Sequence, residues 1–471
     1  MQSDARCWAY EEFGHARLCD ARRTARLVRM AERAVERPGG KVTEVFTDRA
    51  ERQGAYDFLE NDAIHDRDIL ASIRAATVGR ATESPGPTHV IVDGTSVQVV
   101  DRARTKDFGG VGSTANGASG LKVVNAYAVD REGVPIGLVD QQWWARGRLK
   151  KRRDCLRRPL DAKETRHWVE AIGVASAALR GASVPGWFQV DREGDRFWIL
   201  HALHRSGQEF TVRSTYGHRW VRVGDSDRLR RLDRVARRGR VRRVQWLAVT
   251  GRQHRRARTA RLEVRTARVR LDMTESFTGE RLDLPVHVVE VREIGTVPRG
   301  ESPIHWRLLT THTIETEADV RDVVAGYALR WRVEELHRAW KSAVCRIEDT
   351  QLRTAARVTK WATIMVAVAA RAERLKNLSR ASPKKAASVE LSADEIAALL
   401  LLKRRERRRT ETIPDDVPCL EDAVRWIAEL GGYTGKSSGG PPGTVTIRRG
   451  LERVTITAAA LEALREAGKM R

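Results

Sequence analysis

The stretch YALRWRVEELHRAWK, residues 327–341, constrains the fold of this chain more than any other segment. It contains no Gly or Pro and is rich in Ala, Leu, Glu and Arg, which favour helix. Because a helix advances by about 100° per residue, four polar residues would share one face: Tyr327, Arg330, Glu334 and Lys341. The opposite face would be apolar and could pack on a core: Leu329, Val333, Leu336, Ala339 and Trp340. The stretch therefore predicts one amphipathic helix, and a surface helix with solvated charges is the alternative reading.

A second segment, residues 89–100, reads HVIVDGTSVQVV and predicts a buried central strand. Asp93 lies inside it. A carboxylate in a buried strand is unfavourable unless it is paired or binds a metal ion. The alternative is a turn at Asp93, because an Asp-Gly pair favours turns.

A third segment, WFQVDREGDRF, places Asp191 directly after a predicted strand over residues 188–190. Strand ends that face a helix are where α/β folds carry reactive groups. The alternative is an ordinary acidic first turn of a helix. Further strands are predicted over 122–129, 137–144 and 209–214, the last of which carries Arg213, and a helix over 164–179.

The charge of the chain points to a polyanionic partner. It has 471 residues, too many for one core, and 86 Lys and Arg against 62 Asp and Glu give a net charge of +24. Soluble proteins this basic usually bind nucleic acid, although a GC-rich genome also enriches Arg. The apolar run 361–370 is too short to span a membrane, and the first residues lack a signal peptide. Five scattered cysteines indicate neither a disulfide framework nor a zinc site, which fits a reducing cytoplasm.

The N-terminal segment predicts three short helices. Asp20 can cap a helix that runs over 21–40, and others follow after Thr47 and over 64–75. Three arginines on one turn suit contacts to DNA phosphates: Arg22, Arg23 and Arg26. A helical bundle with a solvated Arg face is the alternative. The turn-forming residues 83–88 indicate a domain boundary.

Residues 221–270 contain 18 Arg and predict a β-rich insertion with one face turned to phosphates. A disordered basic loop is the alternative. Strands resume over 285–292 and 305–310. A long helix is expected over 355–378, a helix with a capping box at Ser392 and Glu395 runs into KRRERRR, and another spans 418–430.

The spacing Tyr327, Arg330, Glu334 and Lys341 resembles the signature of the Tn-five-type (IS-four family) bacterial cut-and-paste DDE transposases. DARRTARL, QGAYDFLEN, DREGD and LGGY also resemble segments of that family, whereas the residues after 436 lack its tryptophans. The resemblance implies an α/β fold with an RNase H-like catalytic core. The implied domains are an N-terminal helical end-binding domain over 1–80, the catalytic domain over 81–375 with a β-rich insertion at about 220–295, and a C-terminal helical dimerisation domain over 376–471.

The resemblance also implies the roles of individual residues. Asp93, Asp191 and Glu334 would hold two Mg²⁺ ions, which Mn²⁺ could replace, with Asp93 bridging both. Tyr327, Arg330 and Lys341 would contact phosphates, and DNA contacts are also expected from Arg213, Arg22, Arg23 and Arg26. Two tryptophans, Trp306 and Trp331, would stack on an unpaired base. Packing in the core is the alternative for both.

The implied function is cut-and-paste DNA transposition. The protein would nick the transposon end, form and open a DNA hairpin, and join the end to target DNA. It would act as a homodimer in a synaptic complex, without a membrane, at the bacterial nucleoid in the cytoplasm. The alternatives are a catalytically silent inhibitor or domesticated relative that only binds DNA, and an RNase H-like nuclease without strand transfer.

Overall fold

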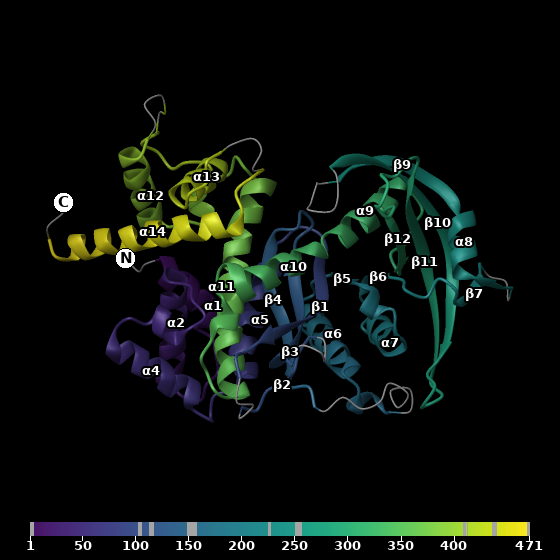
Figure 1. The fold of residues 1–471 in the computed structure, drawn as a ribbon, viewed down its shortest axis with the longest axis horizontal. Coiled ribbons are helices and arrows are strands. Elements are labelled where there is room, and N and C mark those ends of the chain that lie inside the picture. Colours follow the sequence, from purple (N-terminus) through teal and green to yellow (C-terminus); the bar gives the residue numbers. More distant parts are fainter. Residues whose placement is uncertain are drawn as a thin grey trace. The chain divides into compact units, whose positions relative to one another are not determined.

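The computed structural model describes residues 4–101, 106–112, 117–147, 158–224, 228–249, 257–407, 411, 413–435 and 440–468 (Figure 1). The chain divides into two compact units. Unit 1 comprises Met1–Pro85, Gly94–Leu149 and Arg332–Arg471, and unit 2 comprises Gly86–Asp93 and Lys150–Trp331. The division falls inside one strand, β1 (Thr88–Gln98). The predicted domains 1–80, 81–375 and 376–471 were defined by the function expected of each segment, whereas the two units are defined by packing. The predicted domain boundaries therefore stay a prediction.

Unit 1 begins with five helices, α1 (Asp4–Phe13), α2 (Ala21–Glu36), α3 (Val42–Val45), α4 (Arg49–Glu60) and α5 (Asp66–Thr82). The predicted cap of α2 is confirmed, because the Asp20 carboxylate accepts a hydrogen bond of 2.8 Å from the Arg22 amide. The helix ends before Pro38 rather than at the two glycines, since the residue before a proline disfavours helix. The third predicted helix is longer than 64–75, and α1 and α3 are not predicted.

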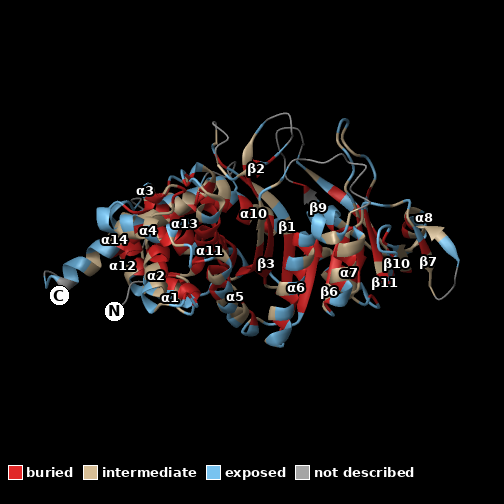
Figure 2. Ribbon diagram, turned by 90° about the horizontal axis from the view of Figure 1, so that it is seen from below, coloured by how far each residue is buried: buried red, intermediate tan, exposed pale blue. Residues whose placement is uncertain are grey.

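Unit 2 contains a row of three parallel strands. The first half of β1 pairs with β5 (Gly186–Val190), and β5 pairs with β6 (Glu209–Arg213). Parallel neighbours need a crossover connection, and between β5 and β6 this includes α7 (Phe197–Arg205). Before β5 lies α6 (Thr165–Gly181), the helix predicted over 164–179, and it packs on α7. In Figure 2 the strands β1 and β6 appear mainly in the colour of buried residues.

The predicted β-rich insertion is confirmed for the residues that the structure describes. It contains β7 (Trp220–Val223), β8 (Leu229–Arg231), α8 (Leu232–Arg238), β9 (Arg240–Val249), β10 (Arg258–Thr274) and β11 (Arg281–Ile294). The alternative of a disordered loop is wrong there, while residues 225–227 and 250–256 of the predicted stretch lie outside the described residues. Strand β12 (His305–Thr310) pairs antiparallel with both β11 and β6, which joins the insertion to the parallel strands.

In unit 1, β3 (Ser119–Val129) pairs antiparallel with β4 (Pro135–Trp144) and with the short β2 (Gly109–Gly110). Both longer strands match those predicted over 122–129 and 137–144. Helices α5 and α11 (Ala355–Ala381) pack against β4. The chain is therefore of mixed α/β class, as predicted. No helix of the described residues is both long and apolar enough to cross a membrane.

The prediction of a single helix over residues 327–341 is wrong. The structure has α9 (Glu317–Ala328), a turn at Leu329 and Arg330, α10 (Trp331–Arg338) and one π-helical turn, η5 (Ala339–Ala343). The amide of Arg330 bonds to the carbonyl of Tyr327 at 3.1 Å, which tightens the chain and ends α9. The prediction of one polar face fails at Tyr327, which is buried.

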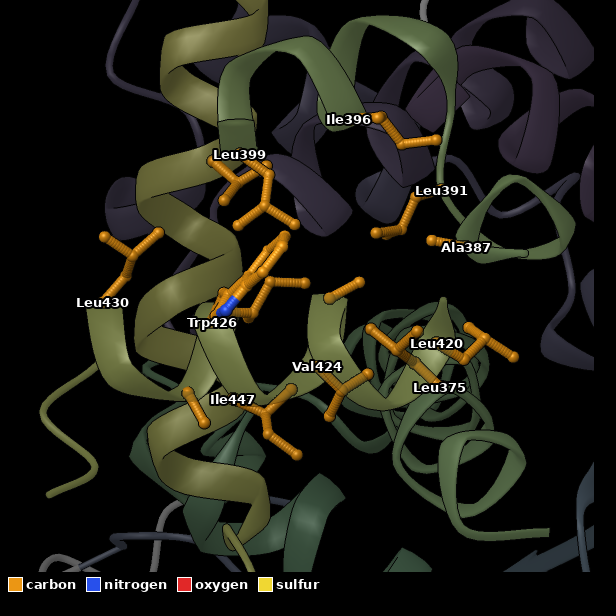
Figure 3. Close-up of a cluster of buried hydrophobic side chains, with 14 of the residues drawn as sticks. Leu375, Ala387, Leu391, Ile396, Leu399, Leu420, Val424, Trp426, Leu430 and Ile447 are labelled. Carbon is orange, nitrogen blue, oxygen red and sulfur yellow. The ribbon is translucent and has the colours of Figure 1, made fainter. Parts of the chain in front are cut away.

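The C-terminal part of unit 1 is a helical cluster formed by the end of α11 with α12 (Ala393–Arg405), α13 (Leu420–Leu430) and α14 (Thr444–Glu466). The predicted capping box of Ser392 and Glu395 is confirmed. A cluster of buried apolar side chains lies between these helices (Figure 3). Helices α13 and α14 cross at two glycines: a Cβ on Gly450 would lie 1.6 Å from the carbonyl oxygen of Ile427, and one on Gly431 would lie 1.9 Å from that of Thr446.

Candidate active site at the ends of parallel strands

Two carboxylates lie side by side in unit 2 because of strand register. Val92 of β1 is the partner of Val190 in β5, so the next residues, Asp93 and Asp191, are neighbours. Adjacent strands lie about 4.8 Å apart. Both side chains are half-buried. The alternative of a turn at Asp93 is wrong, because β1 continues through Gly94 to Gln98.

The third strand of this row supplies a cation. Val190 pairs with Val212 of β6, which places Arg213 next in register beside Asp191. The guanidinium of Arg213 donates a hydrogen bond of 2.8 Å to the carbonyl of His305. The ends of the three strands therefore present two carboxylates and one guanidinium, in the order Asp93, Asp191, Arg213.

Arg330 contacts the first acid. Its Nη1 lies 3.2 Å from Oδ2 of Asp93, and the two side chains are only 16% and 14% exposed. The turn between α9 and α10 is what brings Arg330 to this position. The guanidinium of Arg330 therefore balances the charge of the Asp93 carboxylate at hydrogen-bond distance.

Asp191 is oriented by its own backbone. Its Oδ1 accepts a hydrogen bond of 2.7 Å from the amide of Glu193, which caps the short 3-10 turn η4 (Arg192–Gly194). The sequence DREGD is typical of an acidic helix start. It folds in this way because an Asp side chain readily accepts a hydrogen bond from the backbone amide two residues later in the chain. One oxygen of Asp191 is thus fixed by the chain.

Tyr327 links the two arginines. Burial raises the pKa of the Tyr327 phenol; Arg330 and Arg213 oppose this and Asp191 adds to it. Burial lowers the pKa of Arg213, and the positive charges of the nearby Arg192 and Arg330 lower it further. A hydrogen bond with Tyr327 acts to raise this pKa but does not outweigh the lowering. Tyr327 therefore interacts with both Arg213 and Arg330 beside the two carboxylates.

A polar cavity of about 670 Å³ opens beside these groups and is lined by residues that include Arg192, Arg213, Thr215, His305 and Trp306. The Trp306 ring meets the Tyr327 ring edge-on, with centroids 5.6 Å apart. Trp306 is thus half-buried with one side on the cavity. Trp331 is 44% exposed, so the alternative of a core residue is wrong for it.

Asp195 is a residue of this site that sequence reasoning missed. Its fully buried carboxylate accepts hydrogen bonds from the amides of Thr215 and Tyr216 at 2.7 and 3.1 Å, and pairs with Arg219 at 2.6 Å. It therefore holds the chain that leaves β6 against the cavity. The only signal was the second Asp of DREGD, whose partners lie far along the sequence.

Glu334 and Lys341 belong to unit 1, whereas Asp93 and Asp191 belong to unit 2. Glu334 is half-buried in the first turn of α10, which docks through the buried Val333 and Leu336. Lys341 lies in the π-helical turn and pairs with Glu348 at 3.3 Å. The structure thus brings Asp93, Asp191, Arg213, Arg330 and Tyr327 together, and the convergence of Glu334 with them stays a prediction.

The three N-terminal arginines do not form one open face. Arg22 is 92% exposed and pairs with Asp20 at 3.0 Å. Arg23 donates to the Leu18 carbonyl at 3.2 Å. Arg26 lies over Gly54 of α4, where a Cβ would come within 2.7 Å of the guanidinium carbon. Of the three, Arg22 is the one that projects into solvent.

Three family models match the chain. Residues 5–64 match a transposase DNA-binding domain, residues 196–370 a transposase DDE domain, and residues 367–468 the transposase Tn5 dimerisation domain. The chain belongs to the Tn5-type DDE transposases. The order of the three matches confirms the predicted family and fold class, and the transposase carries a DNA-binding and a dimerisation domain. The DDE match includes Glu334 and begins after Asp93 and Asp191.

DDE domains generally use divalent metal ions, and the residues at the strand ends of this transposase fit one. Carboxylate oxygens are the ligands that Mg²⁺ prefers, and Asp93 and Asp191 supply them from adjacent strands. Within the described part of the chain, no group of three or more His, Cys, Asp or Glu is arranged as a metal site. The guanidinium of Arg330 instead contacts Asp93.

Proposed function

We propose that this transposase cuts and rejoins DNA with Asp93, Asp191 and Glu334 as ligands of two divalent ions, Mg²⁺ or Mn²⁺. The observation that carries the proposal is the register of β1 and β5, which makes Asp93 and Asp191 neighbours at the strand ends. Glu334 enters through the family signature and its place in the first turn of α10, just after Arg330. The resemblance to the family makes Asp93 the proposed bridging ligand.

The ions, when bound, would activate the attacking oxygen and stabilise the leaving oxygen of the phosphodiester. The protein's own part is to bind and orient the DNA strand. Arg330 already lies beside Asp93, so its fork can hold a phosphate oxygen next to the carboxylates. Arg213 and Tyr327 can donate to the same phosphate, and Lys341 to a more distant one.

The cavity beside Trp306 supports a hairpin pathway. In the first step water would nick the transposon end and release a 3′-OH. That hydroxyl would attack the opposite strand, forming one phosphodiester as another breaks, and a second water would open the hairpin. A tight hairpin requires a base to leave the stack, and a polar cavity of about 670 Å³ with an indole on its wall can receive it.

The freed end would then attack target DNA, which completes strand transfer. Transposon-end DNA, target DNA and a second copy of the chain in a synaptic complex are the proposed partners, with the nucleoid of a bacterial cytoplasm as the place of action. The exposed Arg22 and the arginines of the insertion supply positive charge for the DNA backbone.

The test is a cleavage assay with the element's flanking DNA and Mg²⁺. Asp93→Asn, Asp191→Asn and Glu334→Ala should each lose nicking while still binding the DNA end. Asp283→Asn, which alters a half-exposed carboxylate paired with Arg270 on the insertion, is the control and should cut normally. Nicking by all three variants at the wild-type rate would refute the proposed site. Binding without cutting by the unaltered protein would favour a silent DNA-binding relative.

A further inference from the structure

Four charged side chains form a continuous network inside unit 1. Arg332 and Glu335 of α10 pair at 2.9 Å, and Lys376 of α11 reaches the same Glu335 oxygen at 3.4 Å. Lys376 also pairs closely with Glu373 one turn earlier in α11. The charges alternate in sign along the network, so each is balanced by its neighbours.

The centre of the network is almost completely buried. The side chains of Lys376 and Glu373 are 3% and 1% exposed. Burying a charge is unfavourable unless it is paired and hydrogen-bonded. The arrangement of these groups is therefore tightly determined, because moving either end would leave an unpaired charge out of water.

One end of the network reaches the segment that matches the dimerisation domain. Thr444, the first residue of α14, donates a hydrogen bond of 2.8 Å to Glu373 and accepts one of 3.3 Å from Lys376. Glu373, Lys376 and Thr444 all lie within residues 367–468. The start of α14 is thus tied to the middle of the network.

The other end lies next to the proposed metal ligand. Glu335 follows Glu334 in the first turn of α10. A helix that is held at one residue by a buried ion pair cannot rotate without breaking that pair, and rotation would swing the adjacent side chain with it. Apolar packing of Val333 and Leu336 holds the same helix but does not fix its rotation as sharply as directional bonds do.

We infer that Lys376, Glu373 and Thr444 are positioning residues for Glu334: the C-terminal segment sets the rotation of α10 through Glu335 and so holds the metal ligand in place. This inference rests on the proposed role of Glu334. It assigns a catalytic contribution to a segment that the comparisons describe only as a dimerisation domain.

The test compares two buried lysines of the same helix. Lys376→Met removes the centre of the network. Lys360→Met is the matched control, because Lys360 is equally buried in α11 but donates to the carbonyls of Leu59 and Asn61, away from α10. Full-length variants bound to end DNA are titrated with Mn²⁺, and bound metal is followed by electron paramagnetic resonance alongside nicking.

Outer partners of a metal ligand typically contribute at least tenfold to metal affinity, so Lys376→Met should weaken Mn²⁺ binding by about tenfold. The concentration for half-maximal nicking should rise by the same factor, while metal-free DNA binding is unchanged. Lys360→Met should leave the Mn²⁺ titration as in the wild type. Thr444→Val, a milder change that keeps the fold even if Lys376→Met does not, should shift the titration in the same direction by less.

A double-mutant cycle with Glu335→Gln adds a second criterion. If Lys376 acts through Glu335, the two changes together should shift the titration by less than the product of their separate effects. Wild-type Mn²⁺ titrations for both Lys376→Met and Thr444→Val, with Glu334→Ala inactive, would overturn this inference and leave the proposed function standing. Nicking that survives Glu334→Ala would instead overturn the proposed function itself.

Discussion

The guanidinium of Arg330 lies 3.2 Å from the carboxylate of Asp93, a pairing made within unit 2 by the turn that separates α9 from α10. Arg330 therefore occupies one oxygen of the proposed bridging ligand. Before DNA binds, this cation would compete with a metal ion for Asp93. Once DNA binds, a phosphate would give Arg330 an alternative partner.

Arg330→Gln should consequently have opposite effects on metal binding and on cutting. Without DNA, Mn²⁺ binding should tighten, because the competing charge is gone. With DNA, nicking should fall by about tenfold or more, the equivalent of one charge-assisted hydrogen bond. Electron paramagnetic resonance and a cleavage assay measure the two effects. If metal affinity without DNA also falls, Arg330 supports the metal site rather than competing with it.

The exposure of Arg22 separates it from its two neighbours. Arg22→Ala should weaken end binding and lower the salt slope of log K by about 0.9, as expected for one lost phosphate contact. Arg26→Ala should instead lower the melting temperature, because Arg26 packs over Gly54. Binding titrations at several salt concentrations and thermal unfolding distinguish the two. An unchanged salt slope for Arg22→Ala would remove Arg22 from the DNA interface.

Trp306→Ala should leave the first nick nearly normal and slow hairpin formation or opening. Stacking of a base on an indole contributes about 1–3 kcal/mol, and the first nick needs no extruded base. Trp331→Ala should show a smaller effect of the same kind, and an abasic site at the extruded position should partly rescue both. A gel that resolves nicked, hairpin and blunt products over time measures this. Equal loss of all steps would make Trp306 a packing residue.

The buried Glu290 predicts a dependence of stability on pH. Burial acts to raise the pKa of Glu290, but hydrogen bonds from His305 and Arg307 outweigh it and hold that pKa below its ordinary value. A depressed carboxyl pKa stabilises the fold above the ordinary pKa of Glu, and that contribution is lost as pH falls through the folded-state value. The stability difference between wild type and Glu290→Gln should thus be full near neutral pH and shrink at acidic pH.

Urea unfolding of both proteins at several pH values measures this difference, and Glu317→Gln, at a more exposed pair with Arg243, is the control. Arg307→Met should destabilise the fold by about 3–5 kcal/mol at neutral pH, because it leaves Glu290 buried with one partner fewer. A difference for Glu290→Gln that does not change with pH would mean that Glu290 has an ordinary pKa in the fold.

Gly450→Ala should destabilise the C-terminal cluster, since its Cβ would lie 1.6 Å from the Ile427 carbonyl and would push α13 and α14 apart. Overpacking of this kind costs about 1–3 kcal/mol. Gly79→Ala is the matched control in α5, where no atom lies within 4 Å, and it should stabilise by up to about 1 kcal/mol. Thermal unfolding of the two variants should therefore shift in opposite directions, and a neutral Gly450→Ala would contradict the close crossing.

The sequence was sufficient to predict the features that depend on local pattern. The alternating and continuous apolar runs predicted β1, β3, β4 and α11, because burial of one face or of the whole segment leaves a periodic trace. Asp93 and Asp191 could be selected since both interrupt or end such runs. Their adjacency follows from the register of Val92 and Val190, which sequence alone does not fix.

The break between α9 and α10 could not be predicted, because Leu and Arg are good helix formers. It is decided by tertiary contacts: Tyr327 is buried against Trp306 and Arg213, while Arg330 turns to Asp93. Asp195 and the network around Lys376 escaped prediction for the same reason, since their partners come from segments far apart in the chain. Glu334 and Lys341 were predicted as site residues from the family resemblance. The local sequence pattern alone would have predicted only charged residues on the surface of a helix.

The crossing of α13 and α14 selects one register from several. If α14 slid by one turn, Thr446 or Val454 would replace Gly450 at the Ile427 carbonyl, and a β-branched side chain cannot approach a backbone so closely. Registers of α14 that differ by one turn against α13 are thereby excluded. The same register brings Thr444 to Lys376 and Glu373. The close crossing at Gly431 and Gly450 therefore determines that the hydroxyl of Thr444 is the one that reaches the buried charges of α11.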